Sequence, residues 1–550
     1  MSRYRVKRGL RACLLMLAGA VLTACGGGGS SGSPPGNNNP PPPAAITKAE
    51  AYRFLDQATF GPTEAGAQLV VNRGYAGWID DQIAVPASLE LPYLQGLVLP
   101  PGTQLSQTDR LDAWYRNAVL GQDQLRQRVA FALSEIMVVS DQSVLVNFPL
   151  GLAYYYDLLA QNAFGNFREL MEVVTINPSM GVYLSMLGNE KPDSARNIRP
   201  DENYARELMQ LFTLGLVELN PDGTTKLDGQ GQPIPTYTQE TIEGFAHVYT
   251  GWTFGGSLAF FLPSFDFQRP MQAFPSFHAT GAKTVLRGTV IPAGQTPEKD
   301  LDDALDNIFN HPNVGPFIAK ALIQRLTSSN PSPTYVQRVA ARFDNNGAGV
   351  RGDLTAVVRA ILLDSEARAA PTSGNSGKLK EPLIRLIALW RAFDGKAASG
   401  RYLFDQPQVF FGQAPLRSPS VFNFFGPDHQ PTGEIAQAGL FAPEMEIVTE
   451  YSATNMTNYL LFSIYLRNQA TPGLVPNDIY IDIAAEQQLA ADPQAMVNRI
   501  VDRFTGGQTS DAVKAEAVAM ANRAPLSNPT LRVAEALFLI ASSPEYAAIR

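Results

Sequence analysis

The residues best suited to acid–base chemistry lie in two segments in the middle of this sequence. Glu243 and His247 are four residues apart, a spacing that places a carboxylate and an imidazole on one face of a helix. Glu207, in the earlier segment, supplies a second carboxylate. Glu207, Glu243 and His247 are therefore the candidate catalytic residues. The spacing of Glu243 and His247 is equally typical of a structural hydrogen-bonded pair, so both interpretations stay open.

Neither a metal nor a cofactor is expected. A catalytic metal usually needs three protein ligands, and the remaining histidines, His278, His311 and His429, are scattered along the chain. The sequence has no phosphate-binding loop, dinucleotide fingerprint or zincin helix. It also has no nucleophile elbow, in which a serine stands between two glycines.

The first segment, 201–214, is predicted to be a helix with an acidic first turn and Gly215 as its C-terminal cap. Spacing with a period of 3.6 residues separates an apolar face from a polar face. The apolar face consists of Tyr204, Leu208, Leu211 and Phe212. The polar face consists of Asn203, Arg206, Glu207 and Gln210. We expect Arg206 or Glu207 to pair with another polar segment. A solvated polar surface is the alternative.

The second segment, 238–252, is predicted to be a helix capped by Thr238. Helical periodicity dominates the rest of the chain, so the fold class is mainly α, a multi-helical body with small β-hairpin or loop insertions. The insertions are expected at 215–237, around an Asn-Pro-Asp-Gly turn, and at 252–292, which is rich in Phe, Pro and Gly. The stretch 418–427, with three phenylalanines in four residues, predicts an ordered, buried loop.

Several motifs in order give the chain its resemblance to a large bacterial family, domain of unknown function 1800. They are Phe54 with 57–62, 202–215, 249–252, 330–333 with 351–353, and 418–426, and Asn203, Arg206 and Trp252 are the structural motif residues that we take from them. The resemblance implies an exported, mostly helical protein, often encoded beside a member of a second exported family, domain of unknown function 1501, which makes such a protein a candidate partner. It implies no activity.

This sequence departs from the family pattern at two places. Relatives often have an arginine before the Thr-Gly-Trp motif, where this chain has His247. A histidine–aspartate pair ahead of a later lysine appears here as His278 and Ala279 before Lys283. The second departure weakens any metal or acid–base role for that loop.

The N-terminus has the pattern of a bacterial lipoprotein signal, residues 1–24. A start with five basic residues precedes an apolar run, 12–21, and the small residues before Cys25 fit a signal peptidase groove. Cys25 is the predicted lipidation site and new N-terminus. An ordinary secretory signal with a chance cysteine is the alternative. Because Gly26 stands where an aspartate favours inner-membrane retention, the outer membrane is the better prediction within the cell envelope.

Residues 25–45 are predicted to be the lipidated cysteine and a disordered tether of Gly, Ser, Asn and Pro. A flexible chain of that length spans on the order of 25 Å. The helical body follows at 46–550, with 46–200, 201–400 and 401–550 as possible lobes.

The composition narrows the classes of molecule that this protein is expected to bind. Removing the five basic residues of the signal would change the net charge from −8 to about −13, which argues against nucleic acid as a partner. The two cysteines are Cys13, inside the signal, and Cys25, so the mature body has no thiol for a disulfide or a zinc cluster.

Two functions fit this sequence. The first is a membrane-anchored envelope lipoprotein that acts as a helical scaffold or as an export or assembly factor. The alternative is a hydrolase-like enzyme that acts on envelope or extracellular polymer through a Glu/His acid–base site.

The anchor can be tested by changing Cys25 alone. Cys25→Ser removes the thiol that would carry the lipid, so we expect the protein to move from the membrane to the soluble fraction. Fractionation followed by immunoblotting measures this. Unchanged membrane association of Cys25→Ser would refute the lipid anchor.

Overall fold

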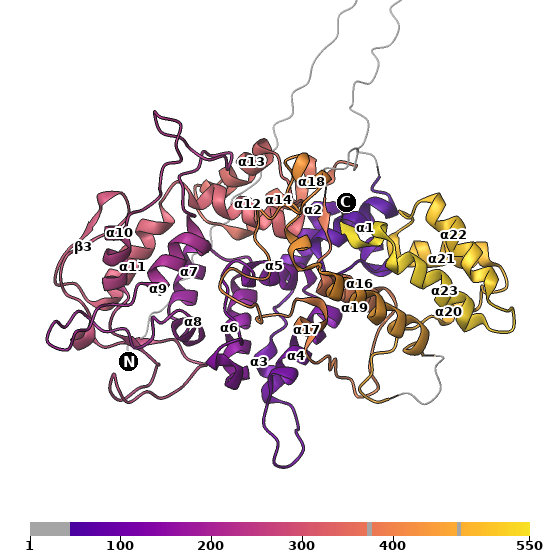
Figure 1. Ribbon diagram of the computed structural model, residues 1–550, viewed down its shortest axis with the longest axis horizontal. Helices are drawn as coiled ribbons and strands as arrows, with labels where there is room; N and C mark the ends of the chain where they lie inside the picture. Colours follow the sequence, from indigo (N-terminus) through magenta and orange to yellow (C-terminus); the bar gives the residue numbers. More distant parts are fainter. Residues whose placement is uncertain (1–44, 371–376, 470–474, 550) are drawn as a thin grey trace, which may run out of the picture. The chain divides into compact units, whose positions relative to one another are not determined.

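In the computed structural model the described residues are 45–370, 377–469 and 475–549. The predicted signal, Cys25 and all of the tether except Ala45 lie outside them. Ile46–Arg550 forms one compact unit (Figure 1). The three lobes within it stay a prediction. No helix among the described residues is both long and apolar enough to cross a membrane.

The described chain is mainly α, as predicted. In its first half the helices are α1 (Lys48–Ala58), α2 (Glu64–Ala84), α3 (Glu90–Gln95), α4 (Gln107–Leu120), α5 (Gln124–Ser134), α6 (Pro149–Asn162), α7 (Phe167–Thr175), α8 (Pro178–Tyr183), α9 (Asn203–Glu207), α10 (Gln239–Val248), α11 (Pro297–Phe309) and α12 (Val314–Leu326). In the second half they are α13 (Pro333–Asp344), α14 (Leu354–Leu363), α15 (Ser365–Arg368), α16 (Pro382–Ala392), α17 (Pro407–Phe411), α18 (Glu434–Gln437), α19 (Glu450–Leu461), α20 (Ala484–Gln487), α21 (Pro493–Thr505), α22 (Asp511–Arg523), α23 (Pro529–Ser542) and α24 (Pro544–Ala547).

Three small antiparallel sheets decorate the described helices. They pair β1 (Trp252–Thr253) with β2 (Gln272–Ala273), β3 (Lys283–Thr284) with β4 (Val290–Ile291), and β5 (Lys378–Leu379) with β6 (Ala548–Ile549). Isolated antiparallel bridges from Val217 to Pro235 and from Leu227 to Pro233 make the segment 215–237 a hairpin. The two predicted non-helical insertions are therefore confirmed.

Helix α5 lies at the centre of the body, with α10 and α11 toward one side of Figure 1 and α20–α23 toward the other. Every residue of α5 except Arg126 is buried, since α2, α4, α6 and α12 all pack against it. A helix buried on all sides is typical of the core of a large domain. Arg128, on this helix, is nevertheless charged and fully buried.

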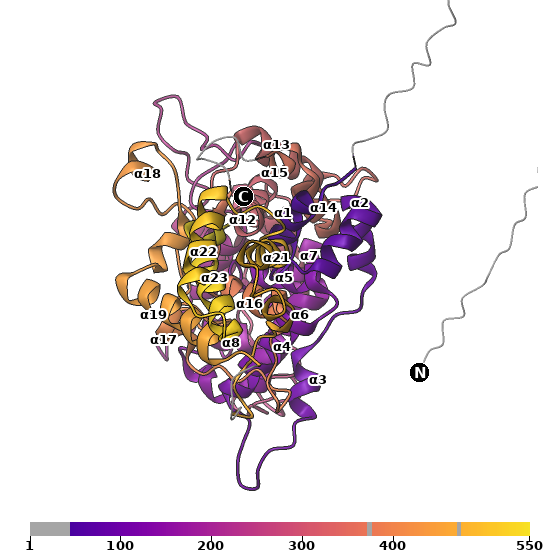
Figure 2. The ribbon, with the colours of Figure 1, turned by 90° about the vertical axis from the view of Figure 1, so that its right-hand side faces the viewer.

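The beginning and the end of the body pack together. The Tyr52 hydroxyl of α1 donates to the Arg503 carbonyl of α21 over 3.0 Å. Gly506, which ends α21 with a φ of +61°, lies so close to the Tyr52 ring that a Cβ atom would come within 2.4 Å of it. Strand β6, near the C-terminus, also contacts α1. Figure 2 shows α21–α23 in front, with α1 and α16 behind them. Helix α1 therefore needs residues from the end of the chain to complete its packing.

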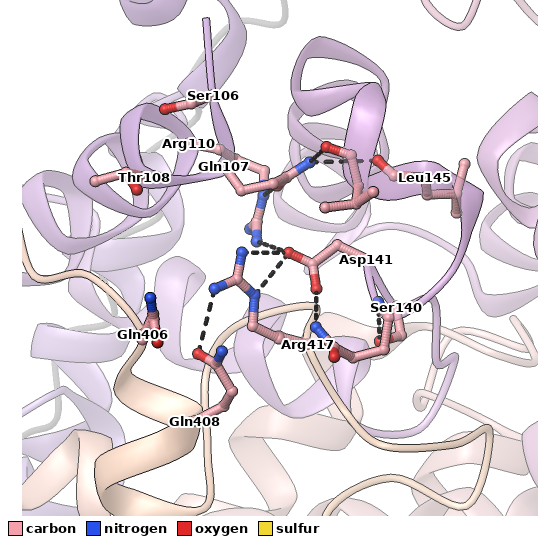
Figure 3. A network of polar contacts seen from close by, with 12 residues as sticks. Ser106, Gln107, Thr108, Arg110, Ser140, Asp141, Leu145, Gln406, Gln408 and Arg417 are labelled. Atoms are coloured by element: carbon pink, nitrogen blue, oxygen red, sulfur yellow. Dashed lines mark hydrogen bonds and ion pairs between the residues drawn. The ribbon is translucent and has the colours of Figure 1, made fainter.

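A buried carboxylate joins two other distant segments (Figure 3). Asp141 accepts from the Arg417 Nε at 2.7 Å, and its Oδ2 lies 3.6 Å from the Arg110 Nη2 of α4. Asp141 and Arg110 are almost completely inaccessible, and Arg417 is 8% exposed. Backbone bonds support this junction, since the Asp141 amide donates to the Leu416 carbonyl over 2.9 Å. One carboxylate thus compensates two cations away from water.

The same junction anchors the loop 418–427. The Ser140 hydroxyl donates to the Ser418 carbonyl over 2.6 Å. Phe424 and Phe425 are buried as predicted, and the Phe425 ring faces the guanidinium of Arg325 at 4.9 Å. Phe422 is 62% exposed, so the prediction of a wholly buried loop is wrong there. The turn at Asn423, whose φ is +68°, directs neighbouring side chains to different sides.

Replacing Asp141 with asparagine should strongly destabilise the fold. The substitution removes the charge that compensates two buried guanidinium groups, and breaking a buried ion pair costs about 3–5 kcal/mol. Urea denaturation followed by circular dichroism measures the loss. The control is Asp81→Asn, which removes an exposed pair with Arg73 and should leave the midpoint almost unchanged. Equal midpoints for Asp141→Asn and the wild type would contradict this role.

Candidate functional site

The segment that carries Glu207 changes its helical geometry half-way along. Helix α9 ends at Glu207, and Leu208–Thr213 continues as a π-helix in which the Thr213 hydroxyl donates to the Leu208 carbonyl over 2.6 Å. The predicted single α-helix over 201–214 is therefore wrong in its second half. Because a π turn holds more residues than an α turn, Met209 is buried and Leu211 is only partly buried.

Glu207 lies inside the protein, although the helical pattern assigned it to the polar face. Its side chain is 7% exposed, and its Oε2 is buried without a hydrogen-bond partner. Burial raises the pKa of Glu207, and the charge of Arg206 offsets only part of that effect. The tyrosines Tyr183 and Tyr237 are close enough for the Glu207 charge to raise their own pKa values, after the larger effect of burial. Glu207 is thus a carboxyl group in a largely apolar, tyrosine-lined setting.

Arg206 and Glu243 belong to a more exposed chain of polar contacts. Arg206 pairs with Glu202, one turn earlier, at 2.9 Å. Gln239, in the first turn of α10, donates to both Glu202 oxygens at 3.0 Å and to Glu243 at 3.4 Å. Glu202 therefore makes the link between the two helices, whereas we expected Arg206 or Glu207 to make it. Asn203 begins α9, where its amide donates to Asp201 over 2.8 Å.

His247 is half-buried near the end of α10, which Thr238 caps as predicted. Burial lowers the pKa of His247, the nearby Lys283 lowers it further, and Glu243 acts in the opposite direction. Lys283 comes this close because Gly244 has no side chain. A Cβ atom there would lie 1.8 Å from the Thr284 carbonyl of β3. His247 is therefore the neutral imidazole of a site that already contains a cation.

Among the described residues, no hydrogen bond or ion pair joins Glu207 to Glu243 or His247. Helices α9 and α10 do pack against each other, and Tyr204 meets Tyr249 edge to face with ring centres 5.0 Å apart. The three candidate catalytic residues thus lie on neighbouring helices in different settings: one buried, one half-buried and one exposed. Their catalytic role stays a prediction.

Beside His247 lies a buried cluster built around Asp300, in the first turn of α11. The Asp300 Oδ2 is 2.8 Å from the His278 Nε2 and 2.5 Å from the Lys283 Nζ. Gln295 donates to the other oxygen of Asp300 over 2.8 Å. All three ionisable groups are almost inaccessible to solvent. The cluster joins the loop of 272–296 to α11.

Both ring nitrogens of His278 lie beside polar groups of the protein. Its Nδ1 lies 2.9 Å from the Thr250 carbonyl, which can only accept, and its Nε2 faces the Asp300 carboxylate. The Thr250 hydroxyl already donates to the His247 carbonyl over 2.7 Å. Both ring nitrogens are therefore engaged within the protein. A ring that is engaged at both nitrogens is suited to holding the loop in place.

A second buried cluster surrounds Glu135 and Glu381. Gln413 donates to Glu135 over 3.2 Å and to Glu381 over 2.7 Å, and Lys378 lies between Glu381, at 3.3 Å, and Glu444, at 3.0 Å. Burial raises the pKa of Glu135, and the charge of Glu381 raises it further. Burial also opposes ionisation of Glu381, but Lys378 and Arg128 outweigh it and lower the pKa of that group. Glu135 therefore keeps its proton while Glu381 is ionised.

The motif residue Trp252 belongs to the small β1–β2 sheet, which follows α10. It pairs with Ala273 in the β1–β2 sheet, is 4% exposed, and its carbonyl accepts from the Gly188 amide over 2.8 Å.

Among the described residues no group of three His, Cys, Asp or Glu side chains is arranged to hold a metal ion.

Comparison with known protein families shows to which family the chain belongs. A family described as "Protein of unknown function (DUF1800)" matches residues 53–548. The chain belongs to this family. No curated protein and no solved structure matches it.

Sequence reasoning missed both buried clusters in this family member. Lys283 and His278 drew notice only as a departure from the family pattern, and Asp300 reads as an ordinary acidic residue in the first turn of a helix. The signal that could have revealed these clusters is a charged residue inside an apolar run. Arg128 and Glu135 interrupt the largely apolar segment 125–139, which has no continuous polar face that could be exposed to solvent.

Glu207→Gln should leave the protein at least as stable as the wild type at pH 7. An amide of similar shape removes a partly buried charge, and Arg206 keeps its own partner, Glu202. Because folding raises the pKa of Glu207, the wild type is penalised when the group is ionised and not when it is protonated. The advantage of the variant should therefore be present at neutral pH and vanish as the pH falls toward 4.

Urea denaturation at several pH values between 4 and 7 measures this difference. Glu516→Gln is the matched control, since Glu516 is exposed, its pair with Arg523 is at 3.6 Å on the surface, and its replacement should leave the pH profile almost unchanged. A Glu207→Gln variant that loses stability at pH 7 would show that the carboxylate has a partner that stabilises it.

Proposed function

We propose that this protein is an envelope lipoprotein, anchored through Cys25, whose helical body serves as a scaffold or as an export or assembly factor. One observation carries the proposal: a lipoprotein-type leader and a low-complexity tether precede a single compact helical unit. A tether holds a body near a membrane while leaving its surfaces free to meet partners.

The distribution of charge supports a structural role for the body. Asp141, Asp300 and Glu381 each compensate cations that are buried with them, so these groups are engaged within the protein. The partner that we propose is an exported protein of the domain of unknown function 1501 family. This choice rests on the family resemblance.

A hydrolase-like activity is the second candidate, and one feature favours it. Glu207 has a raised pKa and an unpaired oxygen in a tyrosine-lined setting, which is how proteins prepare a carboxyl group as a general acid. Its base would be Glu243 or His247, on the neighbouring helix. The substrate would be an envelope or extracellular polymer.

The two functions separate when the acid–base residues are removed without removing the fold. The test strain lacks this protein and produces a tagged exported protein of the domain of unknown function 1501 family from the same bacterium. We would restore the wild type or the triple variant Glu207→Gln, Glu243→Gln, His247→Gln, and measure the tagged protein in the envelope fraction. Circular dichroism of each purified protein confirms folding.

A scaffold predicts that the triple variant restores the envelope level of the partner within about twofold of the wild type, since no reacting group is needed. The enzyme predicts that the folded triple variant behaves like the deletion. A partner level that is unaffected by the deletion itself would refute the scaffold proposal for this partner.

A further inference from the structure

The connection between β1 and β2 contains a loop that exposes four large apolar side chains. They are Leu258, Phe261, Leu262 and Phe265, each between 61% and 93% exposed. The segment 252–265 contains no charged residue. Single exposed apolar residues are common on protein surfaces, whereas several on one short loop mark a contact with a membrane or with another protein. We call the segment 254–265 the apolar loop.

Hydrogen bonds close the apolar loop at its base. The Ser264 amide donates to the Ser257 hydroxyl over 3.1 Å, and the side chain of Gln272 in β2 donates to the Ser257 carbonyl over 2.7 Å. At the tip, the Leu262 amide donates to the Ala259 carbonyl over 3.0 Å, which forms a tight turn. Three of the four exposed apolar residues therefore lie on one closed turn.

Aromatic rings support the apolar loop. Phe260 is 4% exposed and stacks on Phe277 with ring centres 4.2 Å apart, and Phe261 meets Phe277 edge to face at 5.1 Å. Phe265 contacts Phe254 at 5.6 Å. Its φ of +55° is unusual for a bulky residue, so the chain accepts a strained conformation where it exposes this ring. The exposed side chains are thus held on a preformed turn, which lowers the entropic cost of burying them.

The chain that precedes the body brings a membrane within reach of this loop. Twenty residues, 26–45, separate Cys25 from the compact unit. Fully extended, they span about 70 Å, whereas a compact unit of the length of 46–550 has a radius of gyration of about 23 Å. Much of the surface of an anchored body can therefore meet the bilayer. Such a contact is intramolecular, with an effective concentration on the order of millimolar, so a weak apolar contact suffices.

The absence of charge favours lipid over a protein as the occupant. A specific protein interface surrounds its apolar centre with a polar rim that forms hydrogen bonds. Insertion into a bilayer surface needs exposed apolar side chains, and charge opposes it. Asp266 and Arg269 follow the loop and pair with each other at 3.5 Å, so these two residues add no net charge beside it.

We propose that the apolar loop inserts into the surface of a zwitterionic bilayer and forms a second membrane contact of the tethered body. Leu258, Phe261 and Leu262 enter the boundary between the headgroups and the acyl chains. A zwitterionic surface is specified because the net charge of the mature chain, about −13, opposes contact with anionic lipid. The inference rests on the lipid anchor of the proposed function and adds an orientation to it, with the β1–β2 sheet toward the membrane.

The test introduces one fluorescent probe at the tip of the loop. The four native tryptophans are each at most 4% exposed, so the wild type supplies the background. Phe261→Trp, in the full, lipidated chain, is incorporated into phosphatidylcholine vesicles with or without bromine atoms on the acyl chains, which quench tryptophan at short range. We expect the brominated vesicles to remove at least half of the added emission.

Two further variants make the test specific. Leu526→Trp places the same probe at an exposed position between α22 and α23, where brominated vesicles should remove less than a tenth of the added emission. Phe261→Trp combined with Leu262→Asp puts a charge at the loop tip. Quenching should then fall at least threefold, while the far-ultraviolet circular dichroism spectrum stays the same. Flotation of each protein with the vesicles measures the anchor separately.

The outcomes distinguish the loop from the anchor. A chain that floats without quenching at position 261 would overturn the loop contact and leave the anchor intact. Equal quenching at positions 261 and 526, or quenching that Leu262→Asp does not reduce, would also overturn it. Emission at position 261 that is equally blue-shifted without vesicles would assign the loop to a second copy of this chain instead. A chain that does not float would refute the anchor and, with it, this contact.

Discussion

Compensation of buried charge is the constraint on which the rest of this structure depends. Asp141 holds guanidinium groups of α4 and of the loop before 418 together, and Asp300 joins the His278 ring and the Lys283 ammonium group to α11. Each of these contacts joins different elements of the fold, and the pair of Arg417 with Asp141 joins segments that are far apart in sequence. A buried charge without its partner is costly, so each bridge also specifies which segments must meet. The apolar core supplies most of the driving force, whereas these groups restrict how it can be arranged.

Helix periodicity was enough to predict the class of fold, and turn residues located both insertions. Thr238 is a clear example, because its side chain caps α10 as the sequence indicated. The π-helix after Glu207 could not be predicted in this way, since 3.6-residue periodicity assumes regular α geometry. That one irregular turn explains the different burial of Met209 and Leu211. Local patterns thus identify elements but miss the places where tertiary packing overrides them.

The candidate site was harder to predict for the same reason. Spacing placed Glu243 and His247 together on α10, but it could not show that Lys283 would approach them across Gly244. Partners such as His278 and Asp300 are brought together by the loop path, which leaves no periodic trace in the sequence. The packing of the α1–α2 junction on α16 likewise depends on close approach at Gly61, where a Cβ atom would lie 2.5 Å from the Ala388 Cα. The sequence contains that glycine in a motif, without indicating what it approaches.

The packing of Tyr52 on α21 also has a consequence for the order of events during biogenesis. The hydrogen bond from Tyr52 joins residues separated by 451 positions, so α1 cannot complete its native contacts until nearly the whole polypeptide has been synthesised. The entropic cost of closing a loop grows only slowly with its length, so the order of synthesis, more than the size of the loop, determines when this contact can form. Until then α1 lacks part of the surface against which it packs in the folded unit. The last residues to be synthesised are therefore needed before the first helix is fully packed.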